Sequence, residues 1–262
     1  MKMIRDGGRK SMTVRQADNV LRFFEYFAAS QRPATLTQLS ETLELPLSST
    51  SNLVSTLRER GFLFEVRKRG GFYPTRRMHD LTLSILDGDP VLGLVREHME
   101  ALREETGETI LLAAREGDHA IYLEALESRK GVRYSAKAGE TRPIYAISSG
   151  KAILSAFDDA ALRRELAGLD YSEAAETSIT DPDALFDNIV AGRERGWFLN
   201  ATEFTPEVSG AGVLLDIADQ KYGLSVAGPN YRMQGRYDEL GAALARVVAA
   251  IKSQIHESGD GR

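Results

Sequence analysis

The apolar residues of the first 80 positions change their spacing at Gly61, and this change restricts the fold more than any other feature of the chain. Before Gly61 they recur every three or four positions, which predicts helices, and after it they alternate, which predicts strands. The glycine-containing turn 68–71 separates a strand at 62–67 from Phe72-Tyr73, and Pro74 ends the second strand or confines it to an edge. Helices followed by a short hairpin predict a winged helix-turn-helix.

Helical periodicity divides the segment before Gly61 into three pieces. The first helix carries one apolar stripe, which consists of Val14, Ala17, Leu21, Phe24 and Phe27. Pro33 interrupts the chain, and Thr35 and Gln38 then have the capping-box spacing that starts a second, short helix. The apolar residues of that helix are Leu36, Leu39 and Leu43. A tight turn at 44–46 leads to a third helix from about Ser48, whose inward-facing residues are Leu53, Val54 and Leu57.

The other face of the third helix is polar and suits DNA. Short polar side chains can enter a major groove and meet base edges or phosphates. Those of the third helix are Ser48, Ser49, Ser51, Asn52, Ser55 and Thr56. Asn52 can pair with an adenine through two hydrogen bonds, whereas the basic wing tip suits phosphates or the minor groove. The wing-tip residues are Arg67, Lys68 and Arg69. A serine-rich face that is merely solvated is the alternative interpretation.

Charge is divided unevenly along the chain. The first 80 residues contain 14 Lys and Arg against 8 Asp and Glu, a net charge of +6. The other 182 residues contain 19 against 30, a net charge of −11. A basic module joined to an acidic one is typical of a nucleic-acid-binding domain carried by a partner domain. Chance clustering of charge is the alternative, and the helix-turn-helix pattern weighs against it.

We expect a winged helix-turn-helix at 1–76, a helical linker at 77–90 and an effector-binding and oligomerisation domain at 91–258. Helical periodicity continues through the linker and is interrupted at Gly88-Asp89-Pro90. From Thr109 onward, β-like stretches and amphipathic helices follow one another, and the first two stretches meet at a hairpin turn. This order predicts an α+β domain in which helices pack on a largely antiparallel sheet.

Motifs that suggest catalysis are incomplete. Ser149-Gly150-Lys151 resembles part of a phosphate loop, but Tyr145 and Ala152 stand where that loop needs a glycine and a serine or threonine. Ser148 and Lys151 have a Ser-x-x-Lys spacing without the companion motifs of that acyl-enzyme class. The chain has no cysteine, and none of its four histidines lies three or four residues from another. We expect no catalytic residues, no metal site and no cofactor.

Ser148, Ser149 and Gly150 open a helix in the C-terminal domain. The free N–H groups of a helix start favour a carboxylate or a phosphate. An ordinary helix cap, with the glycine present for close packing, is the alternative. No apolar run reaches the roughly 18 residues that cross a bilayer, and the N-terminus lacks the apolar core of a signal peptide. We therefore expect a cytoplasmic protein without a membrane partner.

Several stretches together resemble the IclR family of bacterial transcription regulators over nearly the whole chain. The stretches that carry the resemblance are Leu36–Gly61, Gly107-Glu108-Thr109, Ile121-Tyr122, Pro143–Leu154, Arg195-Gly196-Trp197 and Ala227-Gly228-Pro229. The resemblance implies a GAF-like effector domain, a homodimer or homotetramer, and control by a small organic acid or aromatic metabolite. By position it implies effector-binding residues at Ser148, Ser149, Gly150, Asn200, Gly210, Leu214, Ser225 and Ala227.

The chain departs from the usual pattern of that family at some of these positions. Leu47 and Asn52 stand where the family usually has a basic residue and an arginine, and Tyr145 replaces a histidine. Only one acid remains of the usual acidic pair at Thr202-Glu203. The implied pocket has a polar, anion-tolerant end and a roomier apolar remainder. It predicts a carboxylate ligand with a hydrophobic or aromatic body.

These observations predict a homo-oligomeric transcription regulator that binds a double-stranded DNA operator and responds to a small-molecule effector. One alternative is an enzyme in the C-terminal α+β domain that the basic module tethers to DNA. Another is an architectural protein that binds DNA without regard to sequence. A cluster of catalytic or metal-binding side chains would favour the enzyme, whereas equal affinity for all duplexes would favour the architectural protein.

Overall fold

The structure is a computed structural model that describes residues 14–67, 70–86, 88, 90–217 and 219–259. The chain divides into two compact units, Met1–Asp89 and Pro90–Arg262, which are treated separately. We call them the N-terminal unit and the C-terminal unit. The division lies inside the interval that the sequence predicts as a linker.

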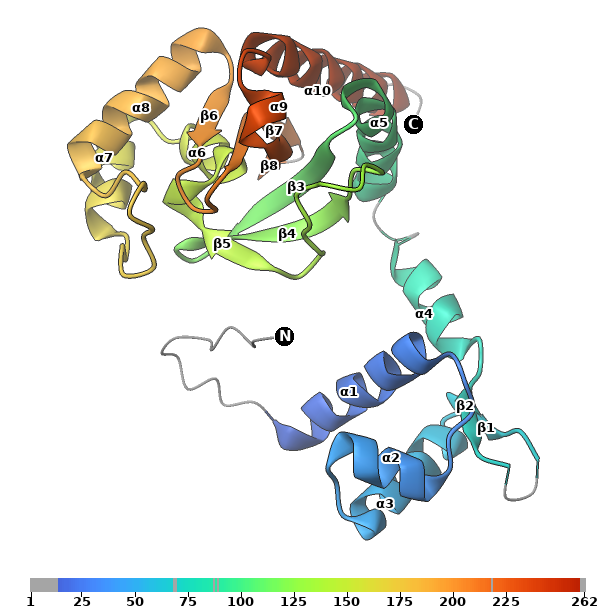
Figure 1. Cartoon of the computed structure of the whole chain (residues 1–262). Helices are drawn as coiled ribbons and strands as arrows, with labels where there is room; N and C mark the ends of the chain where they lie inside the picture. Colours follow the sequence, from blue (N-terminus) through green and yellow to red (C-terminus); the bar gives the residue numbers. More distant parts are fainter. Residues whose placement is uncertain (1–13, 68–69, 87, 89, 218, 260–262) are drawn as a thin grey trace. The chain divides into compact units, whose positions relative to one another are not determined.

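The N-terminal unit is the winged helix-turn-helix that the sequence predicts, which Figure 1 shows in blue to teal. Its elements are α1 (Arg15–Ser30), α2 (Leu36–Leu43), α3 (Leu47–Glu59), β1 (Leu63–Glu65), β2 (Phe72–Pro74) and α4 (Arg77–Leu86). The Thr35–Gln38 capping box starts α2, as the spacing predicts. β1 and β2 pair antiparallel, and Ala34 adds a bridge to Phe72. The hairpin is therefore joined to the segment between α1 and α2 as well as to α3.

The apolar stripe predicted for the first helix is partly wrong about burial. Phe23 and Phe27 are buried in the core of the unit, whereas Val14 and Leu21 are 64% and 63% exposed. Apolar residues occupy more than one face of α1, and the spacing alone does not tell which face α2 and the hairpin cover. Leu21 therefore lies on a second apolar face that the unit leaves open.

In the wing, too, the buried residues differ from those that the alternation groups together. The alternation groups Phe62, Phe64 and Val66, but the buried residue of β1 is Leu63, at 4% exposure. Phe64 and Val66 are 46% and 43% exposed. Both faces of this three-residue strand carry apolar side chains, so the two-residue period does not identify the inner face. Gly61, with φ at +77°, sets the direction in which the strand begins.

The C-terminal unit is the predicted α+β domain, built on an antiparallel sheet with the order β5-β4-β3-β8-β7-β6. Its strands are β3 (Thr109–Glu116), β4 (His119–Leu126), β5 (Thr141–Pro143), β6 (Phe198–Ala201), β7 (Val208–Ile217) and β8 (Gln220–Pro229). Its α-helices are α5 (Pro90–Thr106), α6 (Ser148–Leu154), α7 (Asp159–Gly168), α8 (Pro182–Arg195), α9 (Asn230–Met233) and α10 (Tyr237–Gly259). A 3₁₀ turn, Ile144–Ala146, precedes α6.

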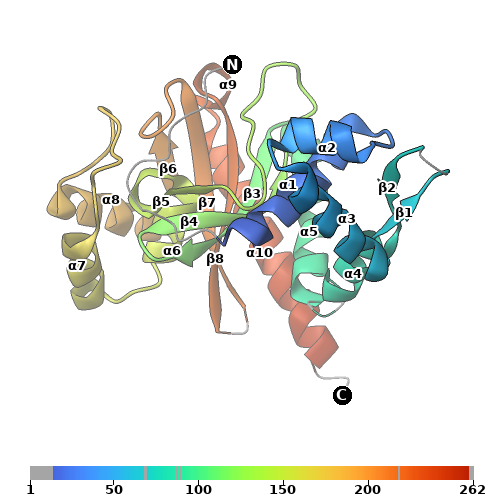
Figure 2. The ribbon, with the colours of Figure 1, turned by 90° about the horizontal axis from the view of Figure 1, so that it is seen from below.

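Helices cover both faces of this sheet. α5 and α10 lie side by side on one face (Figures 1 and 2), where Val95, Met99 and Leu244 form an apolar cluster with alternate residues of β7. α6 packs on the other face, with α7 and α8 beyond it, around a second cluster that includes Leu154 and Leu185. The sheet is thus the middle layer between two cores.

Two glycines allow the start of α6 to approach β7 and β8 closely. A Cβ atom at Gly212 would lie 2.7 Å from the backbone of Ser148, and one at Gly223 would lie 2.2 Å from the carbonyl oxygen of Ser149. The start of α6 therefore rests directly on the backbone of the sheet, which only glycine permits.

Among the described residues, no helix is long and apolar enough to cross a membrane. The same part of the chain contains no group of three or more histidines, aspartates and glutamates placed to hold a metal ion.

Candidate functional site

Helix α3 has one buried face and one exposed polar face. Thr50, Val54 and Leu57 are buried, with exposures of 0%, 2% and 6%. The hydroxyl of Thr50 donates to the carbonyl oxygen of Pro46 at 3.2 Å, so its burial leaves its donor satisfied. The exposed residues are Ser48, Ser49, Ser51, Asn52, Ser55 and Thr56. The polar face predicted for DNA contact is therefore continuous and open.

The turn between α2 and α3 fixes the direction of α3. Glu44 ends α2 in the left-handed region at φ 55°, and the N–H of Leu45 donates to the carbonyl of Ser40 at 3.0 Å. The Ser40 hydroxyl in turn donates to the carbonyl oxygen of Leu45 at 2.6 Å. Pro46 then precedes the first residue of α3. This local network holds the polar face of α3 at a defined angle to α2.

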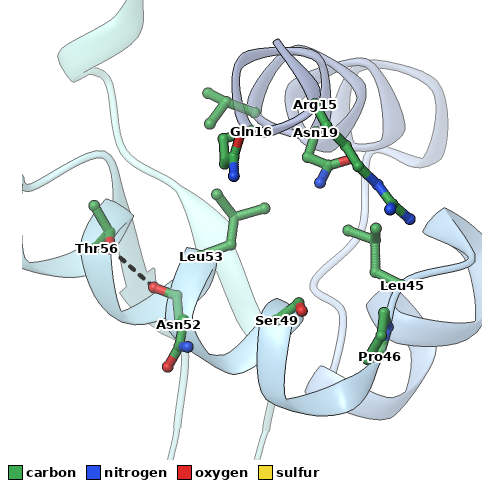
Figure 3. Close-up of a pocket in the computed structure, with 10 residues that line it drawn as sticks. Arg15, Gln16, Asn19, Leu45, Pro46, Ser49, Asn52, Leu53 and Thr56 are labelled. Carbon is green, nitrogen blue, oxygen red and sulfur yellow. Dashed lines mark hydrogen bonds between the residues drawn. The ribbon is translucent and has the colours of Figure 1, made fainter.

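Two of the predicted contact residues differ in what their polar groups can do. The Thr56 hydroxyl donates to the Asn52 carbonyl oxygen at 2.9 Å, a bond within α3 that occupies its hydrogen. The Asn52 side chain is exposed, and its amide end points away from α1 (Figure 3). Asn52 is thus better placed than Thr56 to donate to a base.

Only part of the predicted wing tip belongs to the described residues. Arg67 is exposed, and the turn closes through hydrogen bonds from Gly70 to Arg67 at 2.6 Å and from Val66 to Gly71 at 3.0 Å. Lys68 and Arg69 lie outside the described residues. At the base of the wing, the guanidinium groups of Arg58 and Arg77 lie over the rings of Phe72 and Phe62.

A hollow of about 560 Å³ lies between the first turns of α1 and the polar face of α3 (Figure 3). Arg15, Gln16 and Asn19 of α1 line it opposite Ser49 of α3. The apolar stripe of α1 does not point to these polar residues, so they were not predicted as contact residues. Arg15 and Asn19 are one helical turn apart, and this spacing indicates that the two polar side chains share one face of α1.

In the C-terminal unit, a narrow cavity lies between the start of α6 and the sheet. Five of the eight predicted effector residues line it, namely Ser148, Ser149, Asn200, Ser225 and Ala227. The other lining residues are Leu111, Tyr122, Tyr134, Ile147, Phe204, Thr205 and Val208. Most of the residues implied by the resemblance therefore lie at one place. Tyr122 belongs to the matching stretch Ile121-Tyr122 but was not predicted as a binding residue, and Tyr134 was not singled out at all.

Three predicted effector residues do not line this cavity. A Cβ atom at Gly150 would lie 1.9 Å from the carbonyl oxygen of Ile144, so close packing accounts for this glycine. Gly210 adjoins the lining residue Ser148, whose hydroxyl oxygen would be 3.1 Å from a Cβ atom at this glycine. Leu214 is four residues farther along β7, which corresponds to about 13 Å at the usual rise of a strand.

The polar groups of the cavity are neutral. The Asn200 side-chain oxygen accepts from the N–H of Glu203 at 2.9 Å, which leaves its NH₂ group to donate. The Tyr122 and Tyr134 hydroxyls are 3.4 Å apart. Burial raises the pKa of Tyr122 well above its usual value, so that its hydroxyl keeps its proton near neutral pH. With the serine hydroxyls, these groups offer donors to an anion without a countercharge.

The cavity is nearly closed. Its volume is about 20 Å³, roughly the room for one water molecule. Phe204 and Thr205 form one side, within a segment bounded by Thr202 and Glu207, which adopt the left-handed φ values 64° and 61°. The structure therefore lacks the roomier apolar end expected from the sequence.

A buried ion pair anchors the same segment. Lys151 is fully buried, and its Nζ donates to Oε1 of Glu203 at 2.6 Å and to the carbonyl oxygen of Leu199 at 3.1 Å. Burial lowers the pKa of Lys151, and the neighbouring Glu203 carboxylate opposes that shift. The lysine of the incomplete Ser-x-x-Lys motif is therefore engaged with Glu203 and does not face Ser148 as a base.

Comparisons with known proteins match each of the two units to a family model. The family model of the IclR helix-turn-helix domain matches residues 16–66, and that of the bacterial transcriptional regulator IclR C-terminal domain matches residues 83–253. The acetate operon repressor of Salmonella typhimurium is 27% identical over 236 residues, which cover 88% of this chain and 86% of the repressor.

Solved structures show the same fold. The crystal structure of the Thermotoga maritima IclR covers 92% of this chain and 98% of its own, with a TM-score of 0.76 and 18% identity. An IclR homologue from Microbacterium hydrocarbonoxydans, crystallised with 4-hydroxybenzoate, covers 92% of this chain and 99% of its own, with a TM-score of 0.67 and 22% identity. The C-terminal family model alone spans more than half of the chain. The protein belongs to the IclR family and is a transcription regulator rather than an enzyme.

Proposed function

We propose that the protein is a dimeric repressor that reads duplex DNA with the exposed face of α3 and the wing, and that a carboxylate effector in the C-terminal cavity alters this binding. The observation that carries the proposal is the continuous polar face of α3 opposite its buried face. Its serines and Asn52 present donors and acceptors of the kind that meet base edges and phosphates in a major groove. The net charge of +6 over the first 80 residues favours the phosphate backbone.

Two features support an aromatic or otherwise bulky carboxylate as the effector. The cavity combines neutral donors at Ser148, Ser149 and Asn200 with apolar and aromatic walls. The Microbacterium homologue was crystallised with an acid of this kind, 4-hydroxybenzoate. Because so little of the cavity is open, binding such an acid requires movement of the Phe204 side or of Tyr134. That movement provides a route by which ligand binding changes the conformation of the C-terminal unit.

Exposed apolar side chains in the N-terminal unit support a dimer. Val14, the N-cap residue of α1, and Leu21 within α1 lie seven residues apart, and both are more than 60% exposed. On α4, Leu81 and Ile85, which lie one helical turn apart, are 47% and 68% exposed, and Leu83 on another face is 45% exposed. Apolar stripes at helical spacing are the usual means by which helices associate. A second copy of the chain would cover these stripes and pair two copies of α3 for a two-fold symmetric DNA site.

The test uses duplexes selected by the protein from a random-sequence pool, with affinity measured by fluorescence anisotropy. We expect the selected duplexes to contain an inverted repeat and to bind more tightly than unselected duplexes. An aryl carboxylate such as 4-hydroxybenzoate is expected to change that affinity, and acetate at the same concentration to change it less. Selection of no common sequence would contradict the proposal, because an architectural protein would then fit better. Indifference to a broad panel of acids would contradict the effector assignment.

A further inference from the structure

We propose that the hollow between α1 and α3 binds a phosphate and its adjoining sugar on the DNA strand beside α3, with Arg15 as the charged partner of the phosphate. This inference rests on the proposed DNA-binding function and extends the interface to α1. It gives α1 a role in binding in addition to its role in the core.

The lining of the hollow has a polar rim. Side chains of α1 and α3 face each other across it, as Figure 3 shows for Arg15, Asn19 and Ser49. Arginine, asparagine, glutamine and serine are the side chains that commonly contact DNA phosphates. The lining residues include one cation, Arg15, and no carboxylate. An anion is therefore the ligand that the rim favours.

The floor of the hollow is apolar. Val20 of α1 and Leu53 of α3 are half-buried there, beside the turn residues Leu45 and Pro46. A sugar has apolar C–H faces that pack on such a floor, whereas an isolated inorganic anion does not use it. Polar rim and apolar floor together match a sugar-phosphate unit better than a free anion.

The core of the unit fixes the position of the α1 residues. Asn19, Phe23 and Phe27 follow one another at intervals of four, so they share one face of α1. Phe23 and Phe27 are buried, at 0% and 4% exposure, and their packing holds that face toward the rest of the unit. Arg15 and Asn19 continue the same face beyond the edge of the core. The core therefore fixes the backbone of Arg15 and Asn19, so no loop has to become ordered when DNA binds.

The hollow also shares its residues with the face proposed to read DNA. Ser49, Asn52 and Thr56 line the hollow and lie on the exposed face of α3. A duplex placed against α3 would therefore cover the mouth of the hollow. The contact proposed for Arg15 is to the backbone, so it strengthens binding to every sequence.

The experiment measures affinity against salt concentration with full-length protein and two 40-base-pair probes, a duplex selected by the wild-type protein and an unselected duplex. For Arg15→Ala we expect weaker binding to both probes by a similar factor, about eightfold at 0.1 M salt, because loss of one phosphate contact removes about 0.9 from the slope of log K against log salt. Arg15→Lys should restore most of the slope.

Arg164→Ala is the matched control, because Arg164 is an exposed arginine of α7 in the C-terminal unit. It removes the same charge and should leave the slope unchanged. Wild-type slope and affinity in Arg15→Ala would overturn the inference, and so would a loss confined to the selected duplex, which would indicate a base contact. Failure of the wild-type protein to prefer its selected duplex would instead contradict the proposed function itself.

Discussion

The two units place their proposed sites in opposite environments. In the N-terminal unit, the residues proposed to contact DNA are exposed on α3, and the core beneath them consists of other residues. In the C-terminal unit, Ser148, Ser149 and Ser225 line the cavity and are themselves 4%, 1% and 2% exposed. Binding and stability should therefore be separable in the first unit and coupled in the second.

The largest effect should come from Lys151→Met in the C-terminal unit. The substitution leaves the Glu203 carboxylate buried without its partner, and breaking a buried ion pair in this way costs about 3–5 kcal/mol. We expect a large drop in the unfolding midpoint of this unit in urea, measured by tryptophan fluorescence, because Trp197 is the single tryptophan of the chain. A midpoint within error of the wild type would show that the pair contributes little and would weaken the contrast between the units.

A second buried cluster should make the stability of the same unit depend on pH. The fully buried Glu108 carboxylate accepts from Arg232 at 2.7 and 2.8 Å and from Lys130 at 3.1 Å. Burial raises the pKa of Glu108, but these two cations outweigh burial and hold the pKa below its usual value of 4.5. The cluster therefore contributes stability above about pH 4.5, and that contribution is lost as the pH falls through the lowered pKa.

Arg232→Ala tests this cluster. It should destabilise the unit near neutral pH by about 2–3 kcal/mol, since Lys130 remains to offset part of the loss. It should also reduce the fall in stability as the pH drops below about 4.5, measured by urea unfolding at each pH. Arg129→Ala, which removes an exposed ion pair with Glu104, is the control and should change neither quantity measurably. An unchanged pH profile in Arg232→Ala would assign the acid sensitivity to other carboxylates.

For the exposed face of α3 we expect the reverse, a large effect on DNA binding and a small effect on stability. Asn52→Ala should cost about 1–3 kcal/mol of binding at particular base pairs if the contact to adenine is bidentate. Its effect on the unfolding free energy should stay within about 0.5 kcal/mol, because the side chain is exposed. Repeating the selection with this variant should relax preference at one position of each half-site. A loss of affinity equal for all duplexes would mean that Asn52 contacts the backbone instead.

The same contrast explains what the sequence could predict. The polar face of α3 was predictable because a single helix with one buried stripe presents its other residues to solvent. The full lining of the cavity was not predictable from the spacing of residues along the chain. Tyr134 reaches the cavity from the loop after β4 and Phe204 from the loop after β6, and no periodic pattern connects these two loops. The apolar face of α1 that contains Leu21 was assigned to the core because spacing does not distinguish a buried stripe from one left exposed.

The smallest expected effect is that of Ser225→Ala on effector binding. A neutral hydrogen bond contributes about 0.5–1.5 kcal/mol, so the affinity for an aryl carboxylate such as 4-hydroxybenzoate should fall about 2- to 12-fold in calorimetry. Because Ser225 lies in the middle of β8 and is buried, the substitution should also shift the unfolding midpoint slightly, unlike Asn52→Ala. Ser155→Ala is the control, since the Ser155 hydroxyl donates to Ala152 and does not line the cavity. Equal loss of affinity in both serine variants would mean that the effect is not specific to the cavity lining, and unchanged affinity in Ser225→Ala would move the polar end of the pocket toward Ser148, Ser149 and Asn200.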